Sequence, residues 1–148
     1  MAKDIIDYLK IDTSLDEFLK TRNQAFLDLA KNRLQPLPGL EYSLKLFKDN
    51  DFKVALATSA VNEYIDLVMD KFSVRKYFDA IVSGEDVSKG KPDPETYAVA
   101  ADRLNLKPKE CVVLEDATNG IVSAKGAGCF CIAVVNPYTP VQDVSKSD

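Results

Sequence analysis

The sequence predicts an α/β fold in which a parallel β-sheet is flanked by helices. Two observations carry this prediction. From residue 40 onward, short apolar runs that suit buried strands alternate with longer segments of helical periodicity. Clusters of turn-forming residues separate the two kinds of segment. At 148 residues, the chain is long enough for one such domain with a substantial core.

The N-terminal part is predicted to be helical. A short helix is expected over residues 5–9. Ser14 followed by Glu17 forms a capping box that opens a longer helix. We expect its apolar residues, which recur at near-helical spacing, to pack against other helices: Leu15, Phe18, Leu19, Phe26 and Leu29. The prolines of the segment 36–39 then stop any helix, and we interpret this segment as a linker between two structural layers.

Strands and helices are then expected to alternate to the end of the apolar pattern. The predicted strands are 53–58, 80–83, 111–115 and 129–135. Helices are expected over 40–47, around 65–72, over 94–104 and over 118–127. The polar residues from 138 to 148 carry no clear element, and a loop or a frayed end is expected there.

Composition excludes several classes of function. The formal charge is −4, and the 19 basic residues form no stripe that would bind nucleic acid. No apolar run could span a bilayer and no secretory signal is evident, so we expect a soluble, cytoplasmic protein without a membrane partner. The absence of histidine excludes imidazole bases and the usual zinc sites. Three cysteines lie in apolar stretches, where a thiol serves as a small hydrophobic group: Cys111, Cys129 and Cys131.

Chemically active residues follow three of the apolar segments. In a parallel sheet, ligands bind beyond the carboxyl ends of the strands. Thr58 and Ser59 end one run, Lys91 lies in the loop after the next, and Glu115 and Asp116 end the third. Each feature also has a plainer interpretation: the hydroxyls can cap a helix, the lysine can be solvated surface, and the acids can cap a helix instead of binding a metal.

The order and spacing of these residues resemble the haloacid dehalogenase superfamily. The shared pattern is a strand ending in Thr58-Ser59, then Gly90-Lys91-Pro92-Asp93-Pro94, then a strand ending in Glu115-Asp116 and followed by Gly120-Ile121. The similarity is greatest to phosphoglycolate phosphatase-like and β-phosphoglucomutase-like members, a branch that the segment 36–39 also suggests. The resemblance implies a Rossmann-like parallel sheet flanked by helices.

The resemblance also implies a role for each residue of the pattern. Thr58 would hold a phosphoryl oxygen, with the N–H groups of Ser59 and Ala60 as further donors. Lys91 would offset charge between the nucleophile and the phosphate. The remaining motif residues, Glu115 and Asp116, would bind Mg²⁺, the implied cofactor. This acidic pair favours phosphate chemistry over haloacid chemistry, with a small phosphorylated metabolite as the substrate.

One motif of the family is missing from the sequence. The family's nucleophile lies in Asp-x-Asp-Gly-Thr at the end of an apolar strand, and no such segment occurs here. We therefore expect residues 1–35 to be part of a helical cap and residues 36–148 to be a core without its first strand. That strand would lie between 53–58 and 111–115. We expect these two strands to pair directly, a second copy to exchange a strand, or a separate N-terminal segment to complete the sheet.

Three hypotheses for function follow. The first is a magnesium-dependent phosphatase or phosphomutase that works through an aspartyl-phosphate, of which this chain alone is inactive. The second is a non-catalytic module that binds phosphate and magnesium or serves in assembly. The third is a folding fragment that binds neither. The sequence does not rank the phosphate esters that a complete enzyme would use.

Overall fold

The computed structural model describes residues 2–135 and 142–148. The chain divides into two compact units, Met1–Pro38 and Gly39–Asp148, and each is described by itself. None of the helices within the described ranges is long and apolar enough to cross a bilayer.

The first unit is a pair of helices, as the sequence predicts. Helix α1 spans Ala2–Leu9 and packs against α2, which spans Leu15–Arg33. The Ser14 hydroxyl accepts a hydrogen bond from the backbone N–H of Glu17 at 3.2 Å, so the predicted N-cap is present. Three residues of the apolar stripe stay exposed: Leu15, Phe26 and Leu29.

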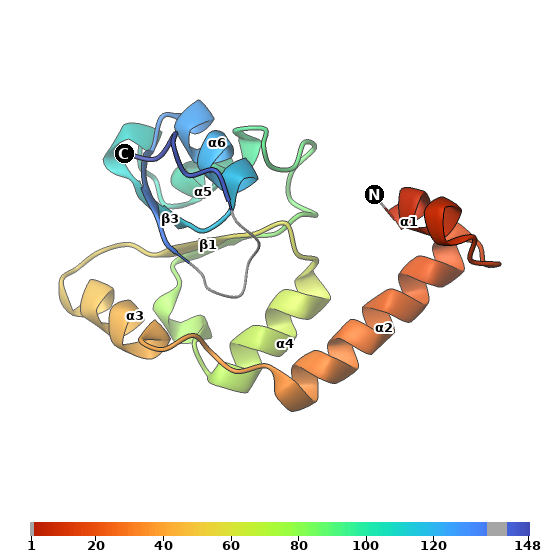
Figure 1. The fold of residues 1–148 in the computed structure, drawn as a ribbon. Helices are drawn as coiled ribbons and strands as arrows, with labels where there is room; N and C mark the ends of the chain where they lie inside the picture. The colour runs from red at the N-terminus through yellow and green to blue at the C-terminus, as the bar shows by residue number, and fades with distance from the viewer. Residues whose placement is uncertain (1, 136–141) are drawn as a thin grey trace. The chain divides into compact units, whose positions relative to one another are not determined.

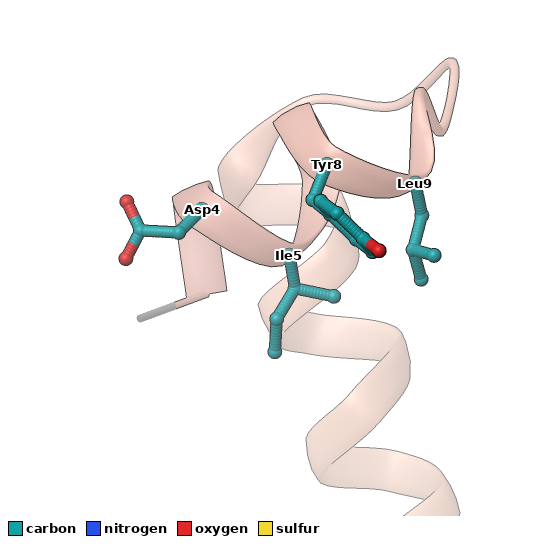
Figure 2. A pocket seen from close by; sticks show the side chains of 4 residues that line it. All are labelled: Asp4, Ile5, Tyr8 and Leu9. Atoms are coloured by element: carbon teal, nitrogen blue, oxygen red, sulfur yellow. The ribbon is translucent and has the colours of Figure 1, made fainter.

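Helix α1 also lines a shallow apolar depression. Figure 2 shows its lining side chains, Asp4, Ile5, Tyr8 and Leu9. The last three are exposed apolar side chains that follow one another at helical spacing. The depression contains none of the predicted site residues.

The second unit alternates helix and strand (Figure 1). Its elements in chain order are α3 (Leu40–Asp49), β1 (Ala55–Ala57), α4 (Asn62–Phe72), β2 (Ala80–Val82), α5 (Glu95–Arg103), β3 (Val112–Glu115), α6 (Thr118–Ala127) and β4 (Phe130–Ala133). Short 3₁₀ turns, Arg75–Tyr77 and Pro108–Glu110, precede β2 and β3. The predicted alternation is confirmed, and the prediction for α6 matches its bounds.

The strands form two separate parallel pairs. Strand β1 pairs with β2, and β3 pairs with β4. Parallel pairing confirms the predicted α/β class. Within the described residues, however, the four strands do not form one sheet, and the first of the three alternatives, direct pairing of 53–58 with 111–115, is wrong. Because β1 and β3 each pair with one strand in the part of the chain that the structure describes, one backbone edge of each has no strand partner there.

Helices cover the β1–β2 pair on both faces. On one face, Leu56 and Ile81 pack against a buried cluster formed by side chains of α3, α4 and the turn after α4: Leu44, Ile65, Met69 and Val74. On the other face, α5 lies against both strands. This pair therefore has the two-sided burial that is typical of parallel strands.

Among the described residues, the β3–β4 pair is covered on one face only. Val113 and Cys131 point into a buried cluster with Tyr97 of α5 and with Ile121 and Ala124 of α6. The neighbouring positions on the strands point to the other face, which is solvent-exposed although it is apolar: Val112, Leu114, Phe130 and Ile132. Cys129 and Cys131 are buried free thiols, in agreement with the predicted role as small hydrophobic groups.

The described end of the chain is a loop anchored to α6 and β4. The Gln142 side chain accepts hydrogen bonds from the backbone N–H and the hydroxyl of Thr118, at 3.0 and 3.1 Å. Asp148 pairs with Lys125 and exchanges two hydrogen bonds with the backbone of Cys131. Residues 142–148 are thus a loop and not a frayed end, whereas 138–141 lie outside the described residues.

Candidate active site

The predicted lysine lies in a loop that its own neighbours hold in place. The Glu95 carboxylate accepts hydrogen bonds from the backbone N–H groups of Ser88 and Lys89, both at 2.8 Å. Ser123 of α6 donates its hydroxyl to the carbonyl of Asp93 at 2.6 Å. The peptide bond from Lys91 to Pro92 is cis. These contacts fix the loop between β2 and α5 to both of the following helices.

Lys91 connects the carboxyl ends of β1 and β3. Its Nζ donates to the Ala57 carbonyl at 3.2 Å and to Glu115 Oε1 at 2.5 Å. A third bond, of 2.7 Å, runs to the hydroxyl of Tyr97. The Lys91 and Glu115 side chains are only 12% and 10% exposed, so this is a nearly buried ion pair. The structure therefore brings together two of the predicted site residues, Lys91 and Glu115, and Lys91 links the ends of two strands that do not pair with each other.

Glu115 accepts hydrogen bonds on both of its carboxylate oxygens. Oε1 accepts from Lys91 and from Tyr97, the latter at 2.6 Å. Oε2 accepts from the backbone N–H groups of Asp116 and Ala117, at 3.0 and 3.1 Å. Burial raises the pKa of Glu115, but the hydrogen bonds from Lys91 and Tyr97 outweigh it and hold the pKa below its ordinary value. Glu115 is therefore a carboxylate in this arrangement.

Gly120 makes room for the Glu115 side chain. A Cβ atom on Gly120 would lie 2.0 Å from Glu115 Cδ, much closer than any real contact. The family-like spacing of Glu115 and Gly120 thus has a direct steric cause: the first turns of α6 pass against the carboxylate, and only glycine leaves space for it. The sequence pattern contained this glycine without revealing its contact.

Tyr97 is a member of the site that sequence reasoning missed. It lies in the first turn of α5, and its hydroxyl contacts both Lys91 and Glu115. Burial, followed by the Glu115 carboxylate, raises the pKa of Tyr97 far above its ordinary value. At the sequence level it resembles the other apolar residues of the helix. Its position six residues after Lys91, one turn into a helix that begins beside the motif, is the signal that could have identified it.

Thr58 and its neighbours form a turn directly after β1. The Thr58 hydroxyl accepts a hydrogen bond from the Ala60 N–H at 3.1 Å, which stabilises the turn itself. It does not cap α4, whose N-cap residue is Val61 and has no side-chain cap bond, so the plainer interpretation as a helix cap is wrong. Ser59 is exposed. The loop after β2 lies against this turn, because Gly84 donates its N–H to the Ala60 carbonyl at 2.9 Å. A Cβ on Gly84 would lie 2.6 Å from the Ser59 carbonyl oxygen, so the close approach requires glycine.

The described residues do not by themselves fit a magnesium ion. Mg²⁺ prefers six oxygen ligands, mostly carboxylates and water. Within residues 2–135 and 142–148, no group of three or more acidic, cysteine or histidine side chains could hold a metal. Both oxygens of Glu115 already accept two hydrogen bonds each. Asp116, half-buried after β3, is the other predicted ligand.

Comparison with known proteins identifies the family of the chain. Residues 1–134 match the family described as haloacid dehalogenase-like hydrolase. A phosphorylated carbohydrates phosphatase of Thermotoga maritima is 36% identical over 124 residues, which is 84% of this chain and 57% of the relative. Hexitol phosphatase B of Escherichia coli is 35% identical over 101 residues, 68% of this chain and 46% of the relative. The chain thus spans about half the length of these curated relatives.

Solved structures show the same fold. CbbY from Rhodobacter sphaeroides, in complex with phosphate, superposes with a TM-score of 0.82 at 28% identity, over 93% of this chain and 63% of that one. A β-phosphoglucomutase from Clostridium difficile gives a TM-score of 0.77 at 26% identity, over 97% and 65%. The family predicted from the sequence motifs is confirmed: the chain belongs to the haloacid dehalogenase-like hydrolases.

Proposed function

We propose that this chain forms the phosphate-handling part of a magnesium-dependent phosphatase or phosphomutase that acts on a small phosphorylated metabolite. The observation that carries the proposal is the nearly buried cluster of Lys91, Glu115 and Tyr97 at the carboxyl ends of β1 and β3. Phosphoryl transfer depends mainly on positioning and on charge neutralisation, and a fixed ammonium group supplies both. The phosphatase names of the relatives support this class of reaction.

Lys91 and Thr58 would carry the phosphate contacts. The Lys91 ammonium is bonded to the carbonyl of Ala57, the residue before Thr58. The ammonium group therefore lies near the end of β1, where Thr58 follows. The turn that follows lies just before helix α4, and its Ser59 N–H would be a further donor. The Ala60 N–H would also serve once it leaves the Thr58 hydroxyl to which it is bonded. A phosphoryl oxygen would replace one acceptor of Lys91. The Ala57 carbonyl, at 3.2 Å the longest of its three bonds, is the one we expect it to displace.

The metal would need ligands beyond this chain's acidic pair. We propose Asp116 and Glu115 as the contribution of these residues to an Mg²⁺ site that groups outside the described residues complete. When bound, Mg²⁺ would neutralise charge on the phosphate. Lys91 and Thr58 would contact the phosphate and not the metal.

The nucleophile would also come from outside these 148 residues. An aspartyl-phosphate mechanism requires an aspartate at a strand end, and the sequence contains no Asp-x-Asp-Gly-Thr. The nearest candidate, Asp49-Asn50-Asp51, lies at the end of α3 and in the turn after it. We therefore propose that the chain alone does not turn over phosphate esters. The names of two relatives refer to phosphorylated carbohydrates and to hexitols. We therefore favour a phosphorylated sugar or sugar alcohol as the substrate of the complete enzyme.

The unpaired edges of β1 and β3 suggest where a completing strand would bind. Since the two strands do not pair with each other, we propose that a strand from an N-terminal segment, or one exchanged by a second copy, adds to these edges. Residues 1–35 would then be part of a helical cap, and 36–148 the core.

A specific observation favours the second hypothesis, a binding module without turnover. Lys91 and Glu115 are held in place by the chain's own hydrogen bonds, whereas no Asp-x-Asp-Gly-Thr nucleophile motif is present in the sequence. Such a module would bind inorganic phosphate in a Mg²⁺-dependent way and would gain no activity when a nucleophile is supplied.

One experiment separates these possibilities. Hydrolysis of p-nitrophenyl phosphate and of a panel of hexose and hexitol phosphates is measured with Mg²⁺, first for the chain alone and then with an apolar strand ending in Asp-x-Asp-Gly-Thr fused upstream. We expect turnover only in the fusion, and we expect Lys91→Ala or Asp116→Ala to abolish it. Lys89→Ala, an exposed lysine of the same loop, is the control. Turnover by the chain alone, or full activity in Lys91→Ala, would contradict the proposal.

A further inference from the structure

Tyr97 lies at the centre of the candidate site although no motif includes it. The residue is 6% exposed, in the first turn of α5. Its ring lies beneath the Lys91 ammonium, with 4.5 Å from Nζ to the ring centroid. Its hydroxyl lies 2.7 Å from Lys91 Nζ and 2.6 Å from Glu115 Oε1. The same side chain therefore contacts both charges of the ion pair.

The protons of the cluster allow one consistent arrangement. A lysine ammonium has three N–H groups, and Lys91 has three acceptors: the Ala57 carbonyl, Glu115 Oε1 and the Tyr97 hydroxyl oxygen. The phenol has a single proton. Because Lys91 can only donate, the Tyr97 proton goes to Glu115 Oε1. Each donor is satisfied once, so the orientation of the ammonium is determined.

We infer that Tyr97 is a positioning residue, which fixes the Lys91 ammonium and the Glu115 carboxylate in one orientation through its hydroxyl. The inference rests on the proposed function for its purpose, since Lys91 is the group that would meet the phosphate. Without the hydroxyl, the ion pair can persist, but one N–H of Lys91 loses its acceptor and Glu115 Oε1 loses a donor. The ammonium then rotates and exchanges its protons more freely.

The contacts distinguish this role from simple packing. A residue that only fills space against Val113 and Ile121 would be replaced equally well by phenylalanine. The hydroxyl, in contrast, forms the two hydrogen bonds that involve charged groups, the strongest class of protein hydrogen bonds. Tyr97→Phe keeps the ring and removes only these bonds.

The test measures the Lys91 ammonium by ¹H–¹⁵N NMR of the 148-residue chain. Lys91→Met assigns the signal, and Tyr42→Phe, at a tyrosine that is 73% exposed, is the control. We expect a Lys91 signal that exchanges slowly with water. In Tyr97→Phe we expect this signal to shift and to exchange at least about tenfold faster, the factor that one lost hydrogen bond to a charged group implies. Circular dichroism monitors the fold of each variant.

Two results would overturn the inference. One is a Tyr97→Phe spectrum in which the Lys91 signal and its exchange rate match those of Tyr42→Phe. The other is a wild-type Lys91 ammonium that exchanges as fast as that of exposed Lys89. If Tyr97→Phe does not fold, the wild-type chain labelled with ¹³C at tyrosine Cζ is measured in a mixture of H₂O and D₂O. A slowly exchanging Tyr97 hydroxyl gives separate Cζ signals for its protonated and deuterated forms. A rapidly exchanging hydroxyl gives one averaged signal and would also overturn the inference.

Neither measurement needs turnover. A completed protein without phosphatase activity would contradict the proposed function and leave the positioning role intact. A freely exchanging Lys91 would overturn the positioning role even in an active protein.

Discussion

The two strand pairs of the second unit differ in how they are covered. The β1–β2 pair lies between α3 and α4 on one face and α5 on the other. The β3–β4 pair has α5 and α6 on one face, while its other face exposes four large apolar side chains. Both pairs have the apolar sequence of strands that are buried on two sides. The comparison teaches that the sequence of β3 and β4 is adapted to contacts that the described residues do not make.

The largest effect is expected where the two pairs are joined. Lys91→Met leaves the carboxylate of Glu115 nearly buried without its cation, which should lower the free energy of unfolding by about 3–5 kcal/mol. Urea denaturation measures this change in the free energy of unfolding. The double variant Lys91→Met/Glu115→Gln removes both charges and should recover most of the loss. An undiminished stability in the single variant would show that the ion pair does not join the pairs.

The next effect contrasts the outer faces of the two pairs directly. Leu56→Ala in β1 removes side-chain contacts with the α3–α4 cluster and should cost about 2–3 kcal/mol. Leu114→Ala in β3 makes the same chemical change on an exposed face and should alter stability by less than about 0.5 kcal/mol. Equal losses would mean that the β3–β4 face is covered in solution, and thermal unfolding at several protein concentrations would then reveal a second copy.

A smaller effect is expected at two glycines of α6. Gly120→Ala places a methyl group against the Glu115 carboxylate, which can move only by giving up its hydrogen bonds, so we expect a loss of about 1–3 kcal/mol. Gly126→Ala is the matched control: its Cβ would make an ordinary contact of 3.4 Å with Pro94, and helix propensity favours alanine there by about 0.5–1 kcal/mol. Two glycine variants with the same stability would refute the steric account of the motif.

The smallest effect on stability is expected for Phe130→Lys on the exposed face of β4. A charge at this half-exposed position should change the unfolding free energy by no more than about 0.5 kcal/mol. It should nevertheless lower the fluorescence of the dye ANS, which binds exposed apolar surface. Unchanged dye binding would mean that this face is not accessible in solution.

Much of the fold follows from local sequence signals. The apolar pattern and the glycine after its end predict α6 to the residue, and Ser14 caps α2 as expected. The predicted strands extend beyond the observed ones, because a strand ends where its ladder of hydrogen bonds ends and periodicity does not show the partner. The same reason explains why one sheet was expected and two pairs are observed: pairing depends on contacts between distant segments.

The sequence predicted the charged residues of the site better than it predicted the contacts between side chains. Motif order identified Lys91 and Glu115, which do meet. It did not reveal Tyr97, whose hydroxyl is unremarkable on an apolar helix face, nor the contact that makes Gly120 necessary. The Thr58 hydroxyl forms the local turn bond to the backbone two residues on that its residue type favours in any protein. The assigned roles in phosphate and metal binding stay predictions.

The loop that ends in Asp148 has a consequence for aggregation. Asp148 donates its N–H to the Cys131 carbonyl and accepts from the Cys131 N–H, both at 2.8 Å, on the side of β4 away from β3. An outer strand edge is normally a site for uncontrolled pairing with other chains. Here the loop occupies that edge at Cys131 with a charged residue held by Lys125. Strand addition at this position of β4 would therefore require the loop to be displaced, whereas an incoming strand at β3 would meet no such contact among the described residues.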